Sequence, residues 1–343
     1  MKAPMSRIAF LRISALCLAG LVCFSVGEVI CLVFFPDTQL RYIHDPEALY
    51  FFEPNQRGIQ ILSNGLPSPP ANINEFGLRG LQMRQEGRKI LVLGDSFTFG
   101  AGVADEETFA SLLDNMLGDE VSVVNGGQPG YGLFQIEATL RRLVDMVRPE
   151  IVVVVLWQGD FLRRPPTENE REALFRNQRI SRVIKASVLL THTYRMIERA
   201  IILLGVERAI PHAGEGGRGV GVDAFLQGLE SDRPVLLAMS KLAIKYGKGL
   251  VIVLWPREDF TAIIPEAEVS LALQLTQRLQ IISRELGVPF GSVQPTMRRL
   301  GRARQLVISG DGHPTPVAHC LAAKAIHEVI SPLGYPLKQE LDC

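Results

Sequence analysis

The sequence predicts an α/β protein with a three-layer α/β/α fold, in which a five-stranded parallel sheet lies between two layers of helices, preceded by one N-terminal transmembrane helix. Three observations predict this. From residue 89 onward, short apolar runs alternate with amphipathic segments of helical period, which is typical of a parallel sheet. These runs are apolar throughout, as strands covered on both faces are. The first 36 residues, by contrast, contain one long apolar run.

Five runs have the length of buried strands, and they are Lys89–Leu93, Val121–Val124, Ile151–Leu156, Gly249–Leu254 and Val288–Val293. Helices are expected at Asp105–Leu117, Leu133–Val147, Ile180–Val206, Asp223–Tyr246 and Glu266–Leu286, with a final helix beginning at Pro314. Asp105 is the expected cap of the first of these helices, and residues 212–222 are expected to form a glycine-rich loop. The apolar helix at 180–206 has two interpretations, a lid or membrane-surface helix and a helix packed on the sheet, and we favour the second.

The apolar run at 13–35 is long enough to cross a bilayer, which takes about 20 apolar residues. Basic residues in the tail at 1–12 favour a cytoplasmic N-terminus, so the rest of a single-pass inner-membrane protein would lie in the bacterial periplasm. Cleavage as a signal peptide after Ser25-Val26-Gly27 is the alternative, which the length of the run disfavours. Glu28 is the only charge in the run, and it either reaches the outer interface or is a functional intramembrane acid.

Composition divides the rest of the chain and excludes several functions. Residues 36–85 are expected to be an extended, irregular, proline-rich extension, 86–335 the α/β domain and 336–343 a C-terminal tail.

The 36 Lys and Arg balance 36 Asp and Glu, so no basic excess indicates nucleic acid. No metal-ligand spacing or phosphate-binding signature is present, so neither a metal nor a cofactor is predicted. Cys320 and Cys343 lie outside the apolar run and could pair in an oxidising compartment, although their spacing does not require it.

The candidate nucleophile is Ser96, in the polar turn that follows the first strand. Ligands of α/β folds bind at the carboxyl ends of the strands, where this hydroxyl is expected. A hydroxyl nucleophile needs a general base, and the base needs an orienting group. Of the six histidines, only His313 lies in a short polar loop with a carboxylate, Asp311, two residues before it. The structural alternative is that Asp311 caps the last helix and His313 is a surface residue.

Acyl transfer also needs hydrogen-bond donors for the oxyanion of the tetrahedral intermediate. The backbone N–H of Ser96 is one expected donor. The glycine-rich turn Asn125–Gly132 follows the second strand, and the segment Trp157–Phe161 follows the third. Because the carboxyl ends of parallel strands meet at one edge of the sheet, these turns are the expected sources of further donors.

Three polar turns at three strand ends, followed by Asp311-Gly312-His313-Pro314, resemble in their order the SGNH hydrolases, also called GDSL esterases and lipases. The match covers about residues 72–330 in ordered blocks. The resemblance implies a flavodoxin-like sheet, with Ser96 as the nucleophile, Gly130 as an oxyanion-hole glycine, and Asp311 and His313 as the rest of the triad. The lead-in segment Asn74–Gly80 looks like one found in membrane-anchored bacterial members.

One block departs from the family pattern. The family has Gly-x-Asn-Asp after the third strand, with the Asn side chain as an oxyanion donor, whereas this chain has Gly159 at the Asn position. Either the Gln158 amide reaches in from one residue earlier, or the oxyanion hole consists of two backbone N–H groups. Asp95, Asn125 and Asp160 are expected to support the site.

The sequence therefore predicts a membrane-anchored, extracytoplasmic serine esterase or acyl hydrolase that acts on an acylated envelope glycan, a lipid or a small ester. Two alternatives stay open. One is an O-acyltransferase with the same nucleophile. The other is a catalytically weakened SGNH-fold binding or scaffold protein of the cell envelope, which the departure at Gly159 motivates. The acyl group, the acceptor and the oligomeric state are not predicted.

Overall fold

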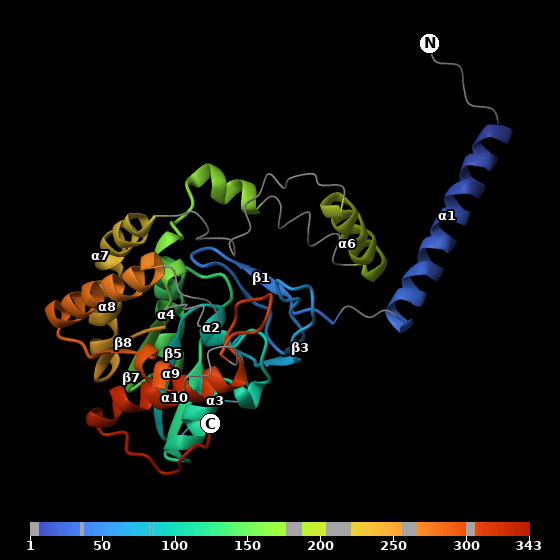
Figure 1. Cartoon of the computed structure of the whole chain (residues 1–343). Coiled ribbons are helices and arrows are strands. Elements are labelled where there is room, and N and C mark those ends of the chain that lie inside the picture. Colours follow the sequence, from blue (N-terminus) through green and yellow to red (C-terminus); the bar gives the residue numbers. More distant parts are fainter. Residues whose placement is uncertain are drawn as a thin grey trace. The chain divides into compact units, whose positions relative to one another are not determined.

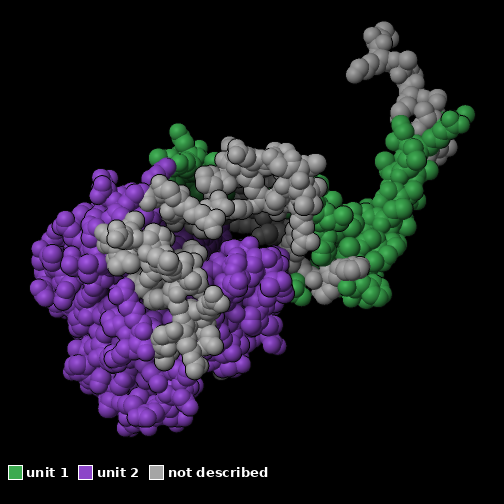
Figure 2. All heavy atoms as spheres, in the orientation of Figure 1, with its two compact units in different colours: residues 1–38, 166–211 green, residues 39–165, 212–343 purple. Residues whose placement is uncertain are grey.

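The computed structural model of the chain describes residues 7–34, 38–81, 83–84, 86–175, 187–203, 221–255, 266–299 and 306–343. Contacts divide the chain into two compact units, coloured separately in Figure 2. Unit 1 consists of residues 1–38 and 166–211, and unit 2 of residues 39–165 and 212–343. Unit 2 contains the sheet, and unit 1 contains the long N-terminal helix.

A parallel sheet of five strands forms the centre of unit 2 (Figure 1), which confirms the predicted α/β fold class. The strand order is β6-β5-β7-β8-β9, the flavodoxin-like order in which the second strand lies at the edge beside the first. The strands are β5 (Arg88–Leu93), β6 (Val121–Asn125), β7 (Ile151–Leu156), β8 (Gly249–Leu254) and β9 (Phe290–Ser292). The last is shorter than the predicted run at 288–293.

Helices cover both faces of the sheet because successive side chains of a strand point to opposite faces. Leu91 and Leu93 join one core cluster, whereas Ile90 and Val92 join the other. The helices of the first face are α4 (Leu133–Val147), α7 (Val222–Tyr246) and α8 (Glu266–Leu286). Those of the second face are α3 (Phe109–Leu117), α9 (Gln294–Arg299) and α10 (Pro316–Ile330), with the 3-10 helix η4 (Ser331–Leu333) after it.

The proline-rich segment before the sheet is more regular than predicted. It forms two antiparallel pairs, which are β1 (Tyr42–Asp45) with β2 (Leu49–Phe52) and β3 (Gln56–Gly58) with β4 (Ala71–Ile73). Phe51 and Phe52 of β2 are fully buried, and Phe51 belongs to a core cluster of the sheet. The expectation of an irregular segment is therefore wrong here, because strands this short carry too little periodicity to be detected.

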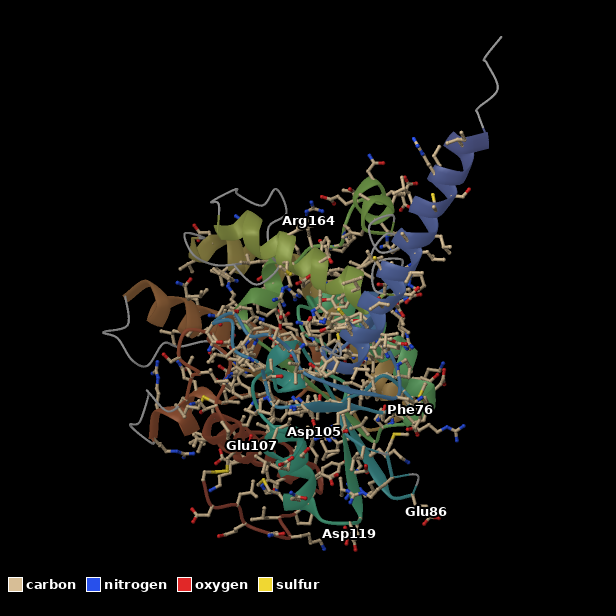
Figure 3. The ribbon with its side chains drawn as sticks, turned by 90° about the vertical axis from the view of Figure 1, so that its right-hand side faces the viewer. Phe76, Glu86, Asp105, Glu107, Asp119 and Arg164 are labelled. Atoms are coloured by element: carbon tan, nitrogen blue, oxygen red, sulfur yellow. A yellow bond between two sulfur atoms is a disulfide. The ribbon has the colours of Figure 1, made fainter. Side chains whose placement is uncertain are left out.

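The helix predicted to begin at Asp105 begins at Phe109, after the 3-10 helix η1 (Asp105–Glu107). The Thr108 side chain is its N-cap. The Asp105 carboxylate is engaged elsewhere, because it pairs with Arg79 at 2.7 Å, and Figure 3 shows it within the body of the molecule. The Asp105 carboxylate also accepts hydrogen bonds from the backbone and side-chain amides of Asn72 at 3.0 and 2.7 Å, so its oxygens face the lead-in segment rather than the first turn of α3.

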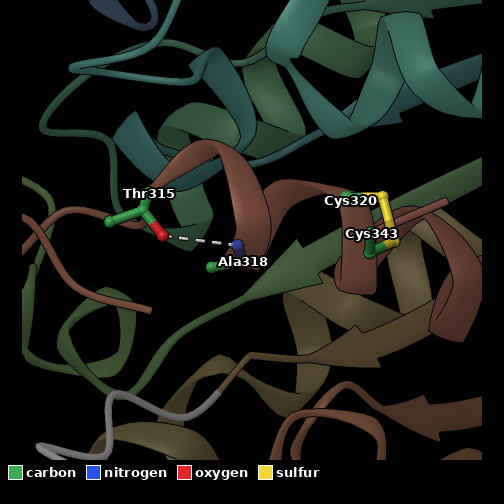
Figure 4. The surroundings of a disulfide bond; sticks show 4 residues. All are labelled: Thr315, Ala318, Cys320 and Cys343. Atoms are coloured by element: carbon green, nitrogen blue, oxygen red, sulfur yellow. Dashed lines mark hydrogen bonds between the residues drawn. A yellow bond between two sulfur atoms is a disulfide. The ribbon is translucent and has the colours of Figure 1, made fainter. Parts of the chain in front are cut away.

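The last helix also begins later than predicted. Its first residue is Pro316 rather than Pro314, and the Thr315 hydroxyl caps it by accepting a hydrogen bond from the Ala318 amide at 3.4 Å (Figure 4). Pro314 instead pairs with Val307 in an isolated β-bridge. Both prolines suit a first helical turn, so the hydroxyl cap decides between them.

A disulfide joins Cys320 of α10 to Cys343, with 5.8 Å between their Cα atoms (Figure 4). The sequence allowed this pairing without requiring it. The bond ties the C-terminal tail to the helix that follows the His313 loop.

Unit 1 contains helix α1 (Arg7–Phe34) and helix α6 (Val188–Leu203). The stretch Arg12–Phe34 of α1 is long and apolar enough to cross a membrane, a property that signal sequences share. α6 is grouped with α1 rather than with the sheet, which differs from the interpretation we favoured for 180–206. Residues 180–186 and 204–206, and most of the predicted loop at 212–222, lie outside the described residues.

Candidate active site

Ser96 and His313 lie within hydrogen-bonding distance although 217 positions separate them in the sequence. Ser96 Oγ is 3.0 Å from His313 Nε2, and His313 Nδ1 is 2.5 Å from Asp311 Oδ2. One ring nitrogen thus faces the hydroxyl and the other faces the carboxylate. An imidazole held in this way can accept the serine proton while the carboxylate fixes its tautomer.

The Asp311 side chain is buried and bound from several sides. Its Oδ1 accepts a hydrogen bond from the Ser63 amide at 2.6 Å, and its Oδ2 also accepts one from the His313 amide at 3.2 Å. Burial raises the pKa of the Asp311 carboxyl, but the hydrogen bonds from His313 and Ser63 outweigh burial and lower the pKa below its usual value. Asp311 therefore stays ionised at neutral pH and does not serve as the cap of α10.

Ser96 begins the one-turn helix α2 (Ser96–Phe99), directly after β5 and Asp95. Asp95 Oδ1 caps this turn by accepting from the Phe97 amide at 2.9 Å. The Phe97 ring lies edge-on to the His313 ring, with 5.9 Å between the ring centroids. The turn therefore presents the hydroxyl and also supplies an apolar wall beside the base.

The glycine-rich loop after β6 lies against this turn. Asn125 Nδ2 donates to the Thr98 carbonyl at 2.9 Å, and Asn125 Oδ1 accepts from the Gly127 amide at 3.0 Å. The Gln128 amide donates to the Gly94 carbonyl at 3.1 Å. A Cβ on Gly127 would lie 2.2 Å from the backbone nitrogen of Phe99, so only glycine permits this approach. Asn125 thus holds the loop after β6 against the turn that carries Ser96.

Gly130 adopts a φ of +81°, in the left-handed region that favours glycine. Tyr50 lies beside it and donates its hydroxyl to the Pro129 carbonyl at 2.7 Å. Within the part of the chain that the structure describes, the amides of Gly130 and Ser96 donate no hydrogen bond. Both N–H groups are therefore available to a ligand oxygen, and their role as oxyanion donors stays a prediction.

Arg163 links the loops after β5, β6 and β7, and the sequence analysis did not single it out. Its Nη1 lies 3.5 Å from Asp95 Oδ2 and 3.2 Å from Asp160 Oδ1, and it donates to the Tyr131 carbonyl. Burial and the nearby Asp95 charge raise the pKa of Asp160 well above its usual value, while Arg163 lowers it. The one signal in the sequence was an arginine three residues after Asp160, within reach on the same helical turn.

The 3-10 helix η2 (Gln158–Leu162) follows β7 and contains the departure from the family pattern. A Cβ on Gly159 would lie 2.1 Å from Cζ2 of the Trp157 ring, so the indole occupies the space that an Asn side chain would need. Trp157 is buried and stacks on Phe97, with 5.5 Å between centroids. Gln158 is partly buried at the start of η2, and its role as a donor stays a prediction.

Arg79, in the lead-in before the sheet, holds the chain that follows α2. Its guanidinium donates to the carbonyls of Phe99 at 2.8 Å, Gly100 at 2.5 Å and Val103 at 2.6 Å, besides its ion pair with Asp105. Five donors in a fixed fork allow one side chain to bind all these groups. The lead-in therefore positions the segment that carries Ser96.

A second histidine, His319, lies near the site but cannot be the base. It is fully buried on α10, and its Nδ1 accepts a hydrogen bond from the Phe109 amide at 3.3 Å. Burial, and then the charges of Arg79 and His313, lower the pKa of His319 to about 3. Among the described residues, no group of three or more His, Cys, Asp and Glu side chains could hold a metal ion.

No protein-family model matches the chain. Over 85 residues it is 36% identical to an arylesterase of Vibrio mimicus, a segment that makes up 24% of this chain and 42% of that protein. The chain thus spans less than half the length of this curated relative.

Solved structures of hydrolases are similar at low identity. An acetylxylan esterase from Geobacillus stearothermophilus, in a catalytic mutant, is 16% identical, with a TM-score of 0.44 over 76% of this chain and 100% of that chain. A lipase/acylhydrolase from Enterococcus faecalis is 16% identical, with a TM-score of 0.39 over 74% and 100%. The esterase EstA from Pseudoalteromonas sp. is 15% identical, with a TM-score of 0.43 over 72% and 98%.

The first three sequence blocks follow β5, β6 and β7, the Asp311–His313 block precedes α10, and one segment is similar to a curated arylesterase. In the order of these blocks the chain resembles the SGNH, or GDSL, hydrolases.

Proposed function

We propose that the chain is a serine ester hydrolase in which Ser96 is the nucleophile, His313 the general base and acid, and Asp311 the group that orients His313. The observation that carries this proposal is the continuous contact from Ser96 Oγ to His313 Nε2 at 3.0 Å and from His313 Nδ1 to Asp311 Oδ2 at 2.5 Å. The buried, ionised Asp311 supports it, since that carboxylate stabilises the imidazolium formed during the reaction.

The first half of the reaction acylates the enzyme. Ser96 Oγ attacks the ester carbonyl carbon, its proton passes to His313 Nε2, and the carbonyl π electrons move to oxygen to form the tetrahedral oxyanion. When the intermediate collapses, the C–O bond to the alcohol breaks and the alcohol oxygen takes the proton from His313. In the second half, His313 removes a proton from water, the resulting hydroxide attacks the acyl carbon, and Ser96 Oγ leaves with the proton that His313 returns.

The oxyanion is bound by the N–H groups of Ser96 and Gly130 in this proposal. Both amides are without a hydrogen bond to the described residues, which supports the assignment. Gln158 is the proposed third donor. Each such donor contributes about 3 to 4 kcal/mol to transition-state binding where one has been removed in other enzymes.

The proposed substrate is an ester whose acyl group sits on an envelope glycan, a lipid or a small alcohol. The similar proteins include an arylesterase and an acetylxylan esterase, which supports ester chemistry without choosing among these classes. An O-acyltransferase would use the same acyl-Ser96, with a sugar hydroxyl in place of water in the second half of the reaction.

We also propose that α1 anchors the chain as a single span of a bacterial inner membrane, with residues 1–12 in the cytoplasm and 86–335 as the periplasmic hydrolase domain. The apolar stretch Arg12–Phe34 supports the anchor. The disulfide between Cys320 and Cys343 supports an extracytoplasmic location, because such bonds persist in oxidising compartments. The anchor brings the site close to substrates of the envelope.

Hydrolysis of p-nitrophenyl acetate by the purified full chain tests the chemistry. His313→Ala is expected to lower kcat by about 10³-fold or more, because the hydroxyl then lacks a base. His327→Ala, a partly buried histidine on the same helix as His319, is the matched control and should keep the wild-type rate. Equal rates for the wild type and His313→Ala would contradict the proposal.

The alternative is a binding or scaffold protein on the same fold. The observation that favours it is the Trp157 ring in the space of the missing Asn side chain. This alternative predicts binding of an acylated glycan fragment by the wild type with no release of the acyl group. Release of acetate that depends on Ser96 would exclude it.

A further inference from the structure

Helices α1 and α6 are joined at Glu28, the only charged residue of the apolar run at 13–35. Its carboxylate accepts hydrogen bonds from the Ser187 hydroxyl at 2.6 Å, the Val188 amide at 2.8 Å and the Leu189 amide at 3.1 Å. Ser187 Oγ in turn accepts from the Leu190 amide at 3.1 Å. Glu28 and Ser187 together satisfy the amides that the first turn of α6 leaves without intrahelical partners.

The two helices approach closely at this point. A Cβ on Gly27 would lie 3.0 Å from Leu189 Cδ2, whereas a Cβ on Gly20, about two turns earlier, would have nothing within 4 Å. Ser187, directly before α6, and Thr191, in its first turn, are also buried. Gly27 and Glu28 therefore form a specific docking contact for the start of α6.

The position of Glu28 in α1 fixes the depth at which α6 begins. The apolar stretch of 23 residues is about 34 Å long, against about 30 Å for the hydrocarbon core of a bilayer. From Glu28 to Phe34 the helix rises about 9 Å. A centred span would place Glu28 about 7 Å inside the hydrocarbon boundary, a depth that interfacial helices reach.

The surface of α6 suits this depth. Leu190, Met196 and Ile197 are 38%, 71% and 54% exposed, and Leu190 and Ile197 are seven residues apart on one helical face. Near Glu28, α1 exposes Ile30 and Val33 in the same manner. Both of the bonded helices thus expose apolar side chains.

From these contacts we infer that α6 is an interfacial membrane helix, docked on the anchor by Glu28, whose exposed apolar face is covered by lipid acyl chains. The inference rests on the proposed role of α1 as a membrane anchor. A docked α6 gives the chain a second membrane attachment besides α1. It also assigns a function to Glu28, the one acid of the span. The carboxylate is tolerated at that depth because three donors replace its water.

Depth-dependent fluorescence quenching tests the inference on the full chain in phosphatidylcholine and phosphatidylglycerol nanodiscs. One sample carries Ile197→Cys with Cys17→Ala, Cys23→Ala and Cys31→Ala, labelled with a nitrobenzoxadiazole dye. A second keeps Cys23, at the middle of the span, as its only free thiol, and a third carries the exposed Ser231→Cys as a control outside the membrane. Lipids carry a nitroxide quencher at a shallow or a deep position of the acyl chain.

We expect the Ile197 label to be quenched most by the shallow nitroxide, the Cys23 label most by the deep one, and the Ser231 label by neither. If Cys23 is quenched and Ile197 is no more quenched than Ser231, the inference is overturned while the anchor stands. Self-quenching between Ile197 labels in that case would assign the α6 face to a second copy of the chain. If Cys23 is not quenched, both the anchor and the inference fail, and hydrolysis of p-nitrophenyl acetate by the same samples tests the esterase separately.

Amide hydrogen exchange of residues 187–191 tests the docking contact. Glu28→Leu and Gly27→Val are expected to speed exchange at least tenfold, because each removes or displaces the bonds at the start of α6. Their matched controls on the same helix are Ser25→Ala, whose hydroxyl bonds only the Leu21 carbonyl among the described residues, and Gly20→Val. Unchanged exchange in Glu28→Leu, or equal effects at Gly27 and Gly20, would overturn the docking.

Discussion

At the scale of single residues, Trp157 and Gly159 have to be understood together. The family pattern has glycine where this chain has Trp157, and asparagine where this chain has Gly159. The larger side chain is therefore at position 157 here and at position 159 in the family pattern. The indole fills the volume beside Gly159 and stacks on Phe97, the neighbour of Ser96. The Trp157 ring therefore occupies the space that a side chain at position 159 would need.

This exchange predicts that substitutions at 157 and 159 are coupled. Gly159→Asn alone should cost about 1–3 kcal/mol in the free energy of unfolding, because the ring must move, and Trp157→Gly alone about 3–5 kcal/mol, because it leaves a cavity. The double variant should lose less than the sum, by about 0.5–3 kcal/mol. Denaturant unfolding followed by far-UV circular dichroism measures these values, and strictly additive losses would show that the two side chains do not compete for space.

His319 predicts a pH dependence of stability. Its pKa is about 3 in the folded state, against about 6.5 when unfolded, so the unfolded state holds more protons between these values. The wild type should lose stability as the pH falls from 6.5 toward 3, by up to about 1.4 kcal/mol per pH unit from this group. In His319→Asn, which keeps an acceptor for the Phe109 amide, this contribution should be absent.

The control for that measurement is His327→Asn, because His327 is only partly buried. Unfolding of each variant is compared with the wild type at pH 5.5 and pH 4. Parallel stability curves for the wild type and His319→Asn would contradict the assignment of a neutral, buried His319.

At the scale of elements, the lead-in segment Asn74–Gly80 holds α2 in position through the hydrogen bonds of Arg79. Arg79 binds three carbonyls of the chain after Ser96 and pairs with Asp105. Arg79→Met would leave these acceptors buried without a donor, so it should cost about 3–5 kcal/mol. Arg41→Met, which removes an exposed partner of Glu53, should cost about 1 kcal/mol or less. Thermal and denaturant unfolding of both variants checks this. Equal losses in the free energy of unfolding would show that the buried hydrogen bonds of Arg79 do not stabilise the fold more than an exposed ion pair does.

The sequence predicted the strands of the sheet well because their runs are apolar on both faces, and it predicted helix starts poorly. At Asp105 and Pro314 the outcome depended on which polar side chain found a tertiary partner, and Thr108 and Thr315 became the caps instead. Ser96, Asp311 and His313 were candidates because a hydroxyl nucleophile needs a base and an orienting group, and the structure brings these three side chains into contact. Arg163 could not, because its partners come from other loops.

At the scale of the whole molecule, the chain has two compact units and a disulfide bond within unit 2. The disulfide between Cys320 and Cys343 closes a loop of sequence separation 23, and a crosslink of that size stabilises a fold by about 3 kcal/mol in the chain-entropy account. Cys343→Ser is expected to lose about that amount under oxidising conditions and nothing relative to the wild type under reducing conditions. Cys17→Ser, at an exposed cysteine of α1, is the control, and equal stability of the two variants in oxidising buffer would show that the bond does not form.

The central claim is that Ser96 is an activated nucleophile. Reaction of the full chain with a fluorophosphonate probe, followed by mass spectrometry of the labelled peptide, tests it most directly. We expect one label per chain, on Ser96, with labelling lost in Ser96→Ala and slowed by at least 10²-fold in His313→Ala, while Ser231→Ala labels as the wild type does. Labelling of Ser96→Ala to the same extent as the wild type, or a label on any other residue, would contradict it.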